Sequence, residues 1–336
     1  MVNFKIFSFF SGSGFLDLGF ENNGFKVEFI NEFHPAFMNA YKYSREKMKL
    51  RKPTYGYFNC DINEFLENRN EELKDWIADA RKDGSLVGFI GGPPCPDFSV
   101  AGKNRGREGD NGKLSLSYTK LIIEMKPDFF LFENVKGLWK TARHRAFFEE
   151  LKANIQEAGF HTTNRLTNAL EYGAPQDRDR ILLFGIQSHL IQNSDLSNFP
   201  WDKYRKYDLE YIKSLPWPDV ECFIENSETI CPEGIPIEMT VQYWFEKNDV
   251  VNHPNGNDFF IPRGGLPRMQ NIKEGDVSKK SYKRLHRWRY SPTVAYGNND
   301  LEKEIDYGDK AKVLLCLILK SKAILVLKPN LDVLTP

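Results

Sequence analysis

Short apolar runs recur through the first half of the chain and alternate with more polar segments. Runs of this length, when bounded by glycine, proline or charged residues, are typical of buried strands. The pattern predicts strands at residues 4–10, 27–30, 86–90 and 128–132, with two more near 160–166 and 181–186.

Helical spacing of apolar residues occurs between these strands. Residues 69–82 place Leu73, Trp76, Ile77 and Ala80 on one face of a helix. Strands that alternate with helices predict an α/β fold built on a parallel sheet. Two more helices are expected near residues 117–125 and 143–158.

The pattern changes after about residue 187. Eight of the 18 prolines lie between residues 191 and 270, periodicity fades, and aromatic residues are scattered. We therefore expect a large catalytic and cofactor-binding domain over 1–187 and a smaller irregular domain with short strands over 188–285. Residues 286–336 would return to the large domain and end in an atypical tail.

Charge is balanced, with 46 basic and 46 acidic residues, so a surface for nucleic acid has to be local. The dense basic stretch 279–290 has interleaved aromatic side chains, a pattern typical of contacts to a phosphate backbone. A solvated basic face is the alternative interpretation of this stretch.

Cysteine usage and the absence of targeting patterns indicate an intracellular setting. The five cysteines form neither a disulfide framework nor closely spaced ligand pairs, so we expect a reducing cytoplasm and no metal. The first residues lack a signal-peptide layout. The apolar segment 313–327 is too short to span a membrane and contains Lys320 and Lys322. We expect a soluble cytoplasmic protein.

A glycine-rich turn follows the first predicted strand. Residues 10–20 read Phe-Ser-Gly-Ser-Gly-Phe-Leu-Asp-Leu-Gly-Phe. A strand, a glycine-rich turn and a helix are the usual opening of a nucleotide-binding α/β sheet, which an NAD-dependent dehydrogenase would share. Glu32, at the end of the second strand, is placed to accept hydrogen bonds from ribose hydroxyls, unless it is merely a solvated carboxylate.

A cysteine follows the strand at 86–90 in the sequence Gly91-Gly92-Pro93-Pro94-Cys95. Glycine allows a sharp turn and proline fixes φ, so the loop is stiff and its shape is set in advance. A thiol in a stiff loop just past a strand is typical of a nucleophile. The alternative is an ordinary buried cysteine.

These segments resemble the DNA (cytosine-5)-methyltransferase family. The catalytic loop of that family reads Pro-Cys-x-x-Phe-Ser-x-x-Gly, and Pro94, Cys95, Phe98, Ser99 and Gly102 match it. The turn at 10–20 is similar to the family's first motif. The resemblance implies a Rossmann-like S-adenosylmethionine-dependent methyltransferase sheet with a smaller irregular target-recognition domain.

The resemblance also implies where the cofactor binds. Asp61 would accept from the adenine amino group and Ile62 would pack on the ring, although Asp61 could equally cap the residues that follow it. The full set implied to bind S-adenosylmethionine is Phe10, Ser11, Gly12, Gly14, Phe15, Leu16, Glu32, Asp61, Ile62 and Pro93.

The implied chemistry is methyl transfer to carbon 5 of a flipped cytosine. Cys95 would add to carbon 6, Glu133 of the triplet Glu-Asn-Val would donate to N3, and Arg178 and Arg180 would reach toward the pocket. Surface ion pairing is the alternative for the two arginines. The residues expected to contact DNA are Pro94, Ser99, Lys103, Arg105, Asn134, Arg287 and Arg289.

The family's tenth motif, which closes the cofactor pocket, has no match here. Gly297-Asn298-Asn299 comes too early, and residues 301–336 resemble nothing in the family. The leading hypothesis is a sequence-specific, monomeric DNA methyltransferase of a restriction-modification system that acts on double-stranded DNA and not at a membrane. A catalytically impaired DNA-binding remnant and a tRNA cytosine-5 methyltransferase are the alternatives, and a dehydrogenase ranks last.

Overall fold

The structure is a computed structural model that describes residues 3–94, 110–191, 196, 199–224, 227, 229–250, 252, 270–278 and 283–293, without the side chains of residues 110 and 111. The described residues divide into two compact units. The first comprises 3–167 and 179–203, and the second comprises 168–178 and the described part of 204–293.

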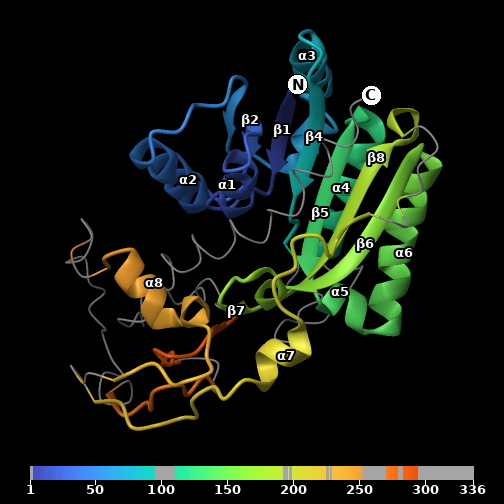
Figure 1. Cartoon of the computed structure of the whole chain (residues 1–336). Helices are drawn as coiled ribbons and strands as arrows, with labels where there is room; N and C mark the ends of the chain where they lie inside the picture. Colours follow the sequence, from blue (N-terminus) through green and yellow to red (C-terminus); the bar gives the residue numbers. More distant parts are fainter. Residues whose placement is uncertain are drawn as a thin grey trace. The chain divides into compact units, whose positions relative to one another are not determined.

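The described strands of the first unit form a seven-stranded sheet in the order β3-β2-β1-β4-β5-β8-β6 (Figure 1). Neighbouring strands from β3 through β5 are parallel, whereas β8 is antiparallel to β5. The strands are β1 Phe4–Phe9, β2 Lys26–Asn31, β3 Gly56–Phe58, β4 Leu86–Gly91, β5 Phe129–Val135, β6 Phe160–Asn168 and β8 Asp179–Gln187.

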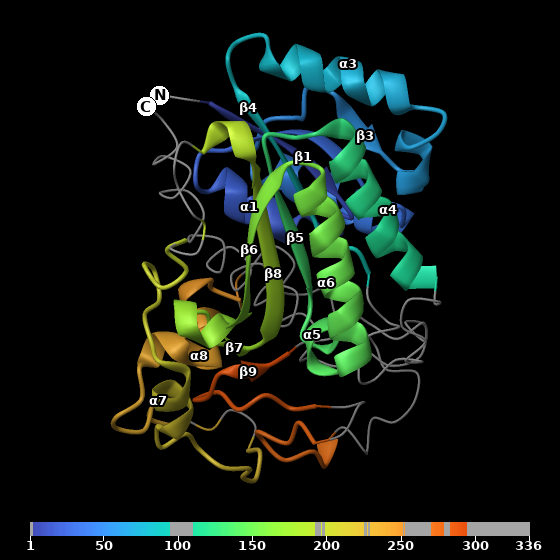
Figure 2. The same cartoon turned by 90° about the vertical axis from the view of Figure 1, so that its right-hand side faces the viewer.

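Helices cover both faces of this sheet. Figure 2 shows α4 and α6 in front of the strands and α1 behind them. The helices of the first unit are α1 Phe15–Glu21, α2 Pro35–Lys47, α3 Asn70–Arg81, α4 Asp110–Met125, α5 Gly137–Lys140 and α6 Ala142–Glu157, with single turns η1 Ile62–Phe65 and η4 Ser188–Leu190. The predicted α/β class with a central sheet is confirmed.

Aromatic side chains fill the core under α3, α4 and α6. The ring of Phe9 lies 4.9 Å from that of Phe89 and 5.2 Å from that of Phe29, so three adjacent strands meet through aromatic contacts. On the opposite face of the sheet, Gly88 leaves room for the ring of Phe129 on β5, because a Cβ there would lie 2.1 Å from that ring. The predicted strands and helices in this part of the chain are all present.

Strand β3 and helix α2 are among the elements of the first unit that were not predicted. Strand β3 has only three residues, and all of them are half-buried, so its apolar run is too short to stand out. Helix α2 has a polar sequence with Met38, Tyr41 and Arg45 as its buried residues. A buried arginine breaks the apolar periodicity that signals a helix.

The second unit contains short helices around two small apolar clusters. One consists of Leu170, Ile212, Trp217, Ile235 and Met239, and the other of Ala169, Ala174, Val241 and Trp244. Its described elements are η3 Ala169–Tyr172, β7 Gln176–Asp177, α7 Leu209–Ser214, η6 Ile237–Met239, α8 Val241–Lys247 and β9 Ser291–Pro292. Within the described residues, the expected short strands are represented by the β7–β9 pair and one isolated bridge.

The boundary between the units lies at residue 203 rather than at 187. Trp201 Nε1 donates to Thr163 Oγ1 at 3.2 Å, and the Phe199 ring lies 4.9 Å from that of Phe184, so this segment packs on β6 and β8. Residues 168–178 and the described residues 286–293 both belong to the second unit. The recognition role of that unit stays a prediction.

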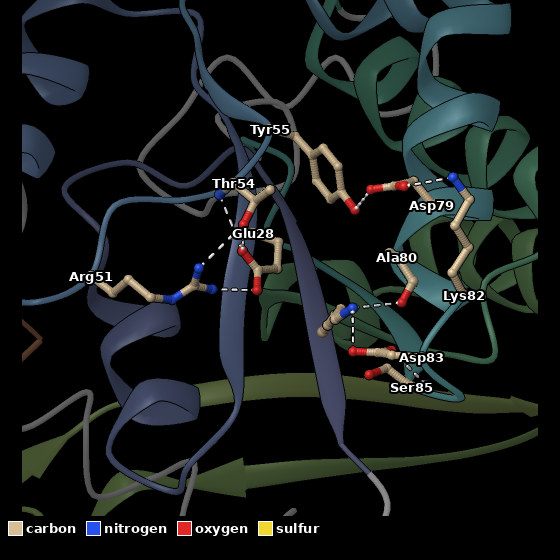
Figure 3. A network of polar contacts seen from close by, with 10 residues as sticks. Glu28, Arg51, Thr54, Tyr55, Asp79, Ala80, Lys82, Asp83 and Ser85 are labelled. Carbon is tan, nitrogen blue, oxygen red and sulfur yellow. Dashed lines mark hydrogen bonds and ion pairs between the residues drawn. The ribbon is translucent and has the colours of Figure 1, made fainter.

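A polar network fastens the first unit at the starts of β1 and β4 (Figure 3). Lys5 Nζ donates to Ala80 O at 2.8 Å and pairs with Asp83 at 2.9 Å. Around these, Glu28 accepts from Thr54 and pairs with Arg51, Asp79 accepts from Tyr55 and Lys82, and Asp83 accepts from Ser85. The network joins β1 and β2 to the loop before β3 and to the turn between α3 and β4.

Among the described helices, none has the length and apolar character needed to cross a membrane.

Candidate active site at the carboxyl ends of the strands

The turn after β1 has an unusual backbone. Phe10, Gly12 and Gly14 have φ values of 51°, 55° and 83°, in the left-handed region that favours glycine. The turn closes through a 2.9 Å bond from Gly14 N to Ser11 O. Glycine is required at position 14, because a Cβ there would lie 2.5 Å from the ring of Tyr41.

Glu32 ties this turn to the end of β2. Its Oε2 accepts from Gly12 N at 2.8 Å and its Oε1 accepts from His34 N at 2.7 Å. Asn59, just past β3, donates from Nδ2 to Glu32 O at 2.7 Å and to Phe33 O at 2.8 Å. The carboxylate predicted to bind ribose therefore also shapes the glycine-rich turn.

Phe33 is a candidate site residue that the sequence analysis missed. Its ring is 68% exposed although it directly follows the buried Glu32. An exposed aromatic face beside a predicted ribose site is suited to stacking on a base. The signal in the sequence was the aromatic residue next to Glu32, but its exposure became evident only in the structure.

A buried charged network lies under the turn. Asp17 is fully buried on α1 and accepts from Ser8 Oγ at 2.8 Å and from Tyr41 OH at 2.9 Å. Burial raises the pKa of Asp17, against the opposing influence of Arg45 and of the two hydroxyl donors. Arg45 donates from Nη2 to Gly14 O at 2.6 Å and pairs with Glu21 at 2.9 Å. Helix α2 thus holds the carbonyl of the last glycine in the turn.

Asp61 caps the single-turn helix η1. Its Oδ1 accepts from Asn63 N at 2.8 Å, which is the N-cap alternative considered for it. The neighbouring Ile62 is 2% exposed and belongs to the apolar core. The cap uses Oδ1 of the carboxylate and is compatible with a hydrogen bond to Oδ2. Contact between Asp61 and adenine therefore stays a prediction.

Glu133 and Arg180 form an ion pair across β5 and β8. Arg180 Nε donates to Glu133 Oε1 at 2.6 Å, and both side chains are largely shielded from solvent. The antiparallel register places Arg180 opposite Val135, close enough for its side chain to reach Glu133. A Cβ at Gly92 would lie 2.7 Å from Glu133 Oε2, so the carboxylate lies directly against the backbone after β4.

Asn134 fixes the same backbone one residue further on. Its side chain is 2% exposed and donates from Nδ2 to Pro93 O at 3.4 Å. Its Oδ1 accepts from Val135 N at 2.8 Å. Glu133 and Asn134 therefore both contact the segment that leads through the exposed Pro94 toward Cys95.

Three parts of the site lie at one level of the sheet: the glycine-rich turn after β1, the Gly-Gly-Pro-Pro segment after β4, and Glu133 near the end of β5. The register pairs Phe9 of β1 with Gly91 of β4, and Gly91 with Phe132 of β5. The glycine-rich turn, the Gly-Gly-Pro-Pro segment and Glu133 therefore leave neighbouring parallel strands at their carboxyl ends. Open α/β sheets bind ligands at this edge.

A profile of the C-5 cytosine-specific DNA methylase family matches residues 4–303. The chain belongs to this family. It is 53% identical over 298 residues to the type II methyltransferase M.NmeDI of Neisseria meningitidis serogroup C, which covers 88% of this chain and 69% of that relative. It is 34% identical over 259 residues to the type II methyltransferase M.FnuDI of Fusobacterium nucleatum, covering 71% of this chain and 68% of that protein.

A solved structure has the same fold as this methylase. It is a DNA modification methyltransferase encoded within a prophage of E. coli, with a TM-score of 0.53 and 19% sequence identity over 87% of this chain and 82% of that one. The family match and the two type II relatives show that the methylase is a DNA cytosine methyltransferase of the type II restriction-modification kind, as the sequence indicated.

The described part of the methylase brings most predicted site residues to one edge of the sheet, but their roles stay predictions. Phe15 and Pro93 are buried and Leu16 is half-buried. Arg178 belongs to the second unit, where its carbonyl accepts from Ala169 N at 3.1 Å, whereas Arg180 belongs to the first. The predicted residues Cys95, Phe98, Ser99, Gly102, Lys103 and Arg105, and the tail 301–336, lie outside the described residues.

Two arginines of the basic stretch near the end of the methylase make hydrogen bonds within the second unit. Arg287 donates from Nε and Nη2 to Glu274 at 2.8 and 3.0 Å and from Nη1 to Ser227 O at 2.7 Å. Arg289 donates to Pro218 O at 3.1 Å. These guanidinium groups brace the second unit, and contact of Arg287 and Arg289 with DNA stays a prediction.

The family and the fold imply S-adenosylmethionine as the cofactor. The turn of this methylase fits such a ligand. Ser11 Oγ is buried without a hydrogen-bond partner among the described residues, and no atom lies within 4 Å of a Cβ built on Gly12. The Ser11 hydroxyl can therefore form a hydrogen bond with a ligand, and the space beside Gly12 can accommodate it. No cluster of three or more potential metal ligands occurs among the described side chains.

Proposed function

We propose that this methylase transfers a methyl group from S-adenosylmethionine to carbon 5 of a cytosine flipped out of a specific duplex DNA site, through a covalent Cys95 adduct. The observation that carries the proposal is the common level of the three segments, with Phe9, Gly91 and Phe132 in register. The glycine-rich turn, the backbone leading to Cys95 and Glu133 converge there.

The cofactor supplies an electrophilic methyl group when it is bound. On the protein side, Glu32 offers carboxylate oxygens to the ribose hydroxyls, and Phe33 offers an exposed ring to the adenine. Ser11 Oγ and the open side of Gly12 accommodate the remainder of the ligand. Asn59 supports this arrangement because it holds both Glu32 and Phe33 by their carbonyls.

The reaction needs a nucleophile because carbon 5 of cytosine is weakly nucleophilic. The Cys95 thiolate adds to carbon 6, and a proton bound at N3 neutralises the charge that arrives in the ring. Glu133 is the proton donor when its carboxyl group is protonated, with Oε1 held by Arg180 and Oε2 on the Gly92 side, and it takes the N3 proton back when the thiolate leaves. After carbon 5 gains the methyl group, a base removes its proton and the thiolate leaves carbon 6.

The target cytosine has to leave the helix to reach this site. Flipping costs a few kcal/mol, which contacts to the DNA backbone must offset. We assign target recognition to the second unit, and we propose a monomer that acts on DNA in the bacterial cytoplasm.

The test is transfer of labelled methyl groups to mixed-sequence duplex DNA, followed by nucleoside analysis. We expect 5-methylcytosine with the intact protein and none with Cys95→Ser. Transfer RNA run in parallel separates the two polymers, and calorimetry with S-adenosylmethionine separates an active enzyme from an impaired DNA-binding protein. Absence of transfer to DNA despite cofactor binding would contradict the proposal.

Bisulfite sequencing of DNA from cells that express the chain would give the recognised site. A single modified sequence context is expected, and methylation spread over unrelated contexts would contradict sequence specificity.

A further inference from the structure

Helix α4 contacts three parts of the candidate site through two consecutive residues, Ser117 and Tyr118. The helix runs across one face of the sheet, as Figure 2 shows, and Cys95 precedes it in the sequence. Tyr118 is fully buried, whereas Ser117 is half-buried. Their contacts reach the backbone after β4, the glycine-rich turn and the cap of η1.

The Tyr118 ring lies directly against the end of the strand that leads to Cys95. A Cβ built on Gly91 would lie 2.7 Å from the Cζ atom of Tyr118, so the ring and the backbone are in close contact. Tyr118 OH donates to Leu131 O at 3.3 Å on the neighbouring strand β5. Burial raises the pKa of Tyr118 well above its ordinary value, so the hydroxyl remains a neutral donor.

The same ring supports the glycine-rich turn. It meets the Phe10 ring edge-on, with ring centres 6.0 Å apart and an angle of 89° between the planes. Phe10 has a φ of 51°, a strained conformation for a residue other than glycine, which persists only where the surrounding structure holds it. Tyr118 belongs to that surrounding structure. It therefore joins the turn predicted to hold the methyl donor to the backbone that leads to the nucleophile.

Ser117 extends this support to the predicted adenine site. Its Oγ donates to Asn63 Oδ1 at 2.7 Å. The backbone N–H of Asn63 donates to Asp61 Oδ1 at 2.8 Å, which connects Ser117 to the cap of η1. This cap follows β3, and β2 and β1 lie between β3 and β4 in the sheet. Helix α4 therefore connects two loops whose strands are not neighbours.

We propose that Tyr118 and Ser117 are positioning residues that hold the bound cofactor and the backbone of Cys95 at a fixed separation, an inference that rests on the proposed function. Reaction requires atoms about 3–3.5 Å apart, and a displacement of about 1 Å can lower the rate roughly 100-fold. The donor and the nucleophile belong to different loops, and loops are more mobile than the elements they connect. A helix that contacts these loops restricts their relative movement.

The first experiment compares Tyr118→Leu with Phe130→Leu in the full chain. Both changes remove a fully buried ring, but Phe130 lies near the start of β5, where it packs against Gly185 and Phe160. Tyr118→Phe keeps the ring and is the conservative variant. Steady-state methyl transfer gives kcat and KM, calorimetry gives Kd for S-adenosylmethionine, and thermal unfolding gives the melting temperature.

We expect both leucine variants to have lowered melting temperatures, because each leaves a cavity in the core. The kcat of Tyr118→Leu should fall roughly 10- to 100-fold, and by more than its affinity for S-adenosylmethionine. Phe130→Leu should keep the kcat of the unchanged protein. Tyr118→Phe should restore most of the rate, because the ring makes the contacts with Gly91 and Phe10.

The second experiment tests the link to the adenine site. Ser117→Ala removes the bond to Asn63, and the control Ser188→Ala removes a bond of equal length, 2.7 Å, to Gly159 O. We expect the Kd for S-adenosylmethionine to rise roughly 3- to 10-fold in Ser117→Ala, the usual effect of one hydrogen bond, and to stay unchanged in the control. Because Ser117 is half-buried, this test applies even if Tyr118→Leu does not fold.

Equal kcat values for Tyr118→Leu and Phe130→Leu would overturn the inference, because the Tyr118 ring would then serve stability alone. A Tyr118→Phe variant as slow as Tyr118→Leu would also overturn it, since the hydroxyl and not the ring would set the rate. Equal Kd values for the two serine variants would overturn the role of Ser117. Failure of the unchanged protein to methylate DNA would refute the proposed function itself, whereas the other outcomes concern variants of an active enzyme.

Discussion

At the scale of single residues, the site depends on how closely Glu133 approaches the backbone after β4. Glu133 and Arg180 were both predicted, since each lies in a recognisable motif at a strand end. Their ion pair, and the contact of Glu133 with Gly92, required the structure because they depend on the pairing of β4, β5 and β8.

Replacing Gly92 by alanine should impair catalysis more than cofactor binding. The new Cβ would lie 2.7 Å from Glu133 Oε2, so the carboxylate has to move. A displacement of about 1 Å in a catalytic group can lower kcat by roughly 100-fold. Steady-state methyl transfer would measure kcat, and calorimetry should give an unchanged Kd for S-adenosylmethionine.

Gly88→Ala, within β4, is the matched comparison for this change just after the strand. Its Cβ would meet the buried ring of Phe129 at 2.1 Å, so overpacking should cost about 1–3 kcal/mol of unfolding free energy. If Gly92→Ala lost stability like Gly88→Ala while keeping its kcat, the role assigned to Glu133 would be wrong.

At the scale of elements, helix α2 supports the glycine-rich turn from below. Arg45 is 3% exposed, bonds to Gly14 O and Glu21, and lies over the Tyr41 ring at 4.2 Å. Neither this helix nor its arginine was predicted, because a buried charge looks like a surface position in the sequence. The link joins residues 31 positions apart in the chain.

Arg45→Lys should weaken cofactor binding. Lysine has a single charged nitrogen and no planar group to cover the Tyr41 ring, so it cannot keep all the contacts of arginine. We expect Kd for S-adenosylmethionine to rise roughly tenfold, about 1.4 kcal/mol, with DNA affinity unchanged. Arg51→Lys is the control, because Arg51 pairs with Glu28 away from the turn (Figure 3). Equal effects of the two variants on cofactor affinity would show that Arg45 has no special role in the turn.

At the scale of the whole molecule, the two units have different stabilising interactions. The first has a large aromatic core, whereas the second combines two small clusters with buried ion pairs. Glu274 is 4% exposed; burial opposes its ionisation, but the hydrogen bonds and charge of Arg287 outweigh burial and lower its pKa below 4.5. A lowered pKa means that ionised Glu274 stabilises the second unit above pH 4.5, and that this stability is lost as the pH falls through the folded-state value.

Glu274→Gln should therefore destabilise the second unit at neutral pH by about 3 kcal/mol, the usual cost of leaving a buried charge without its partner. Its stability should depend less on pH below 4.5 than that of the unchanged protein. Hydrogen exchange of residues 209–247 across this pH range would measure both effects. Parallel pH profiles for the two proteins would rule out the Glu274–Arg287 pair as the origin of the acid sensitivity.

The amino-acid sequence alone determined the family, the α/β sheet, most strand positions and the motif residues at the strand ends, because these depend on short motifs and local apolar patterns. Tertiary structure decided the approach of Glu133 to Gly92, the support of Gly14 by Arg45, the bonding of Arg287 to Glu274 and the boundary at residue 203. Each of these is a contact between segments separated in the chain, so its partner cannot be read from neighbouring residues. The packing of the folded chain brings such partners together.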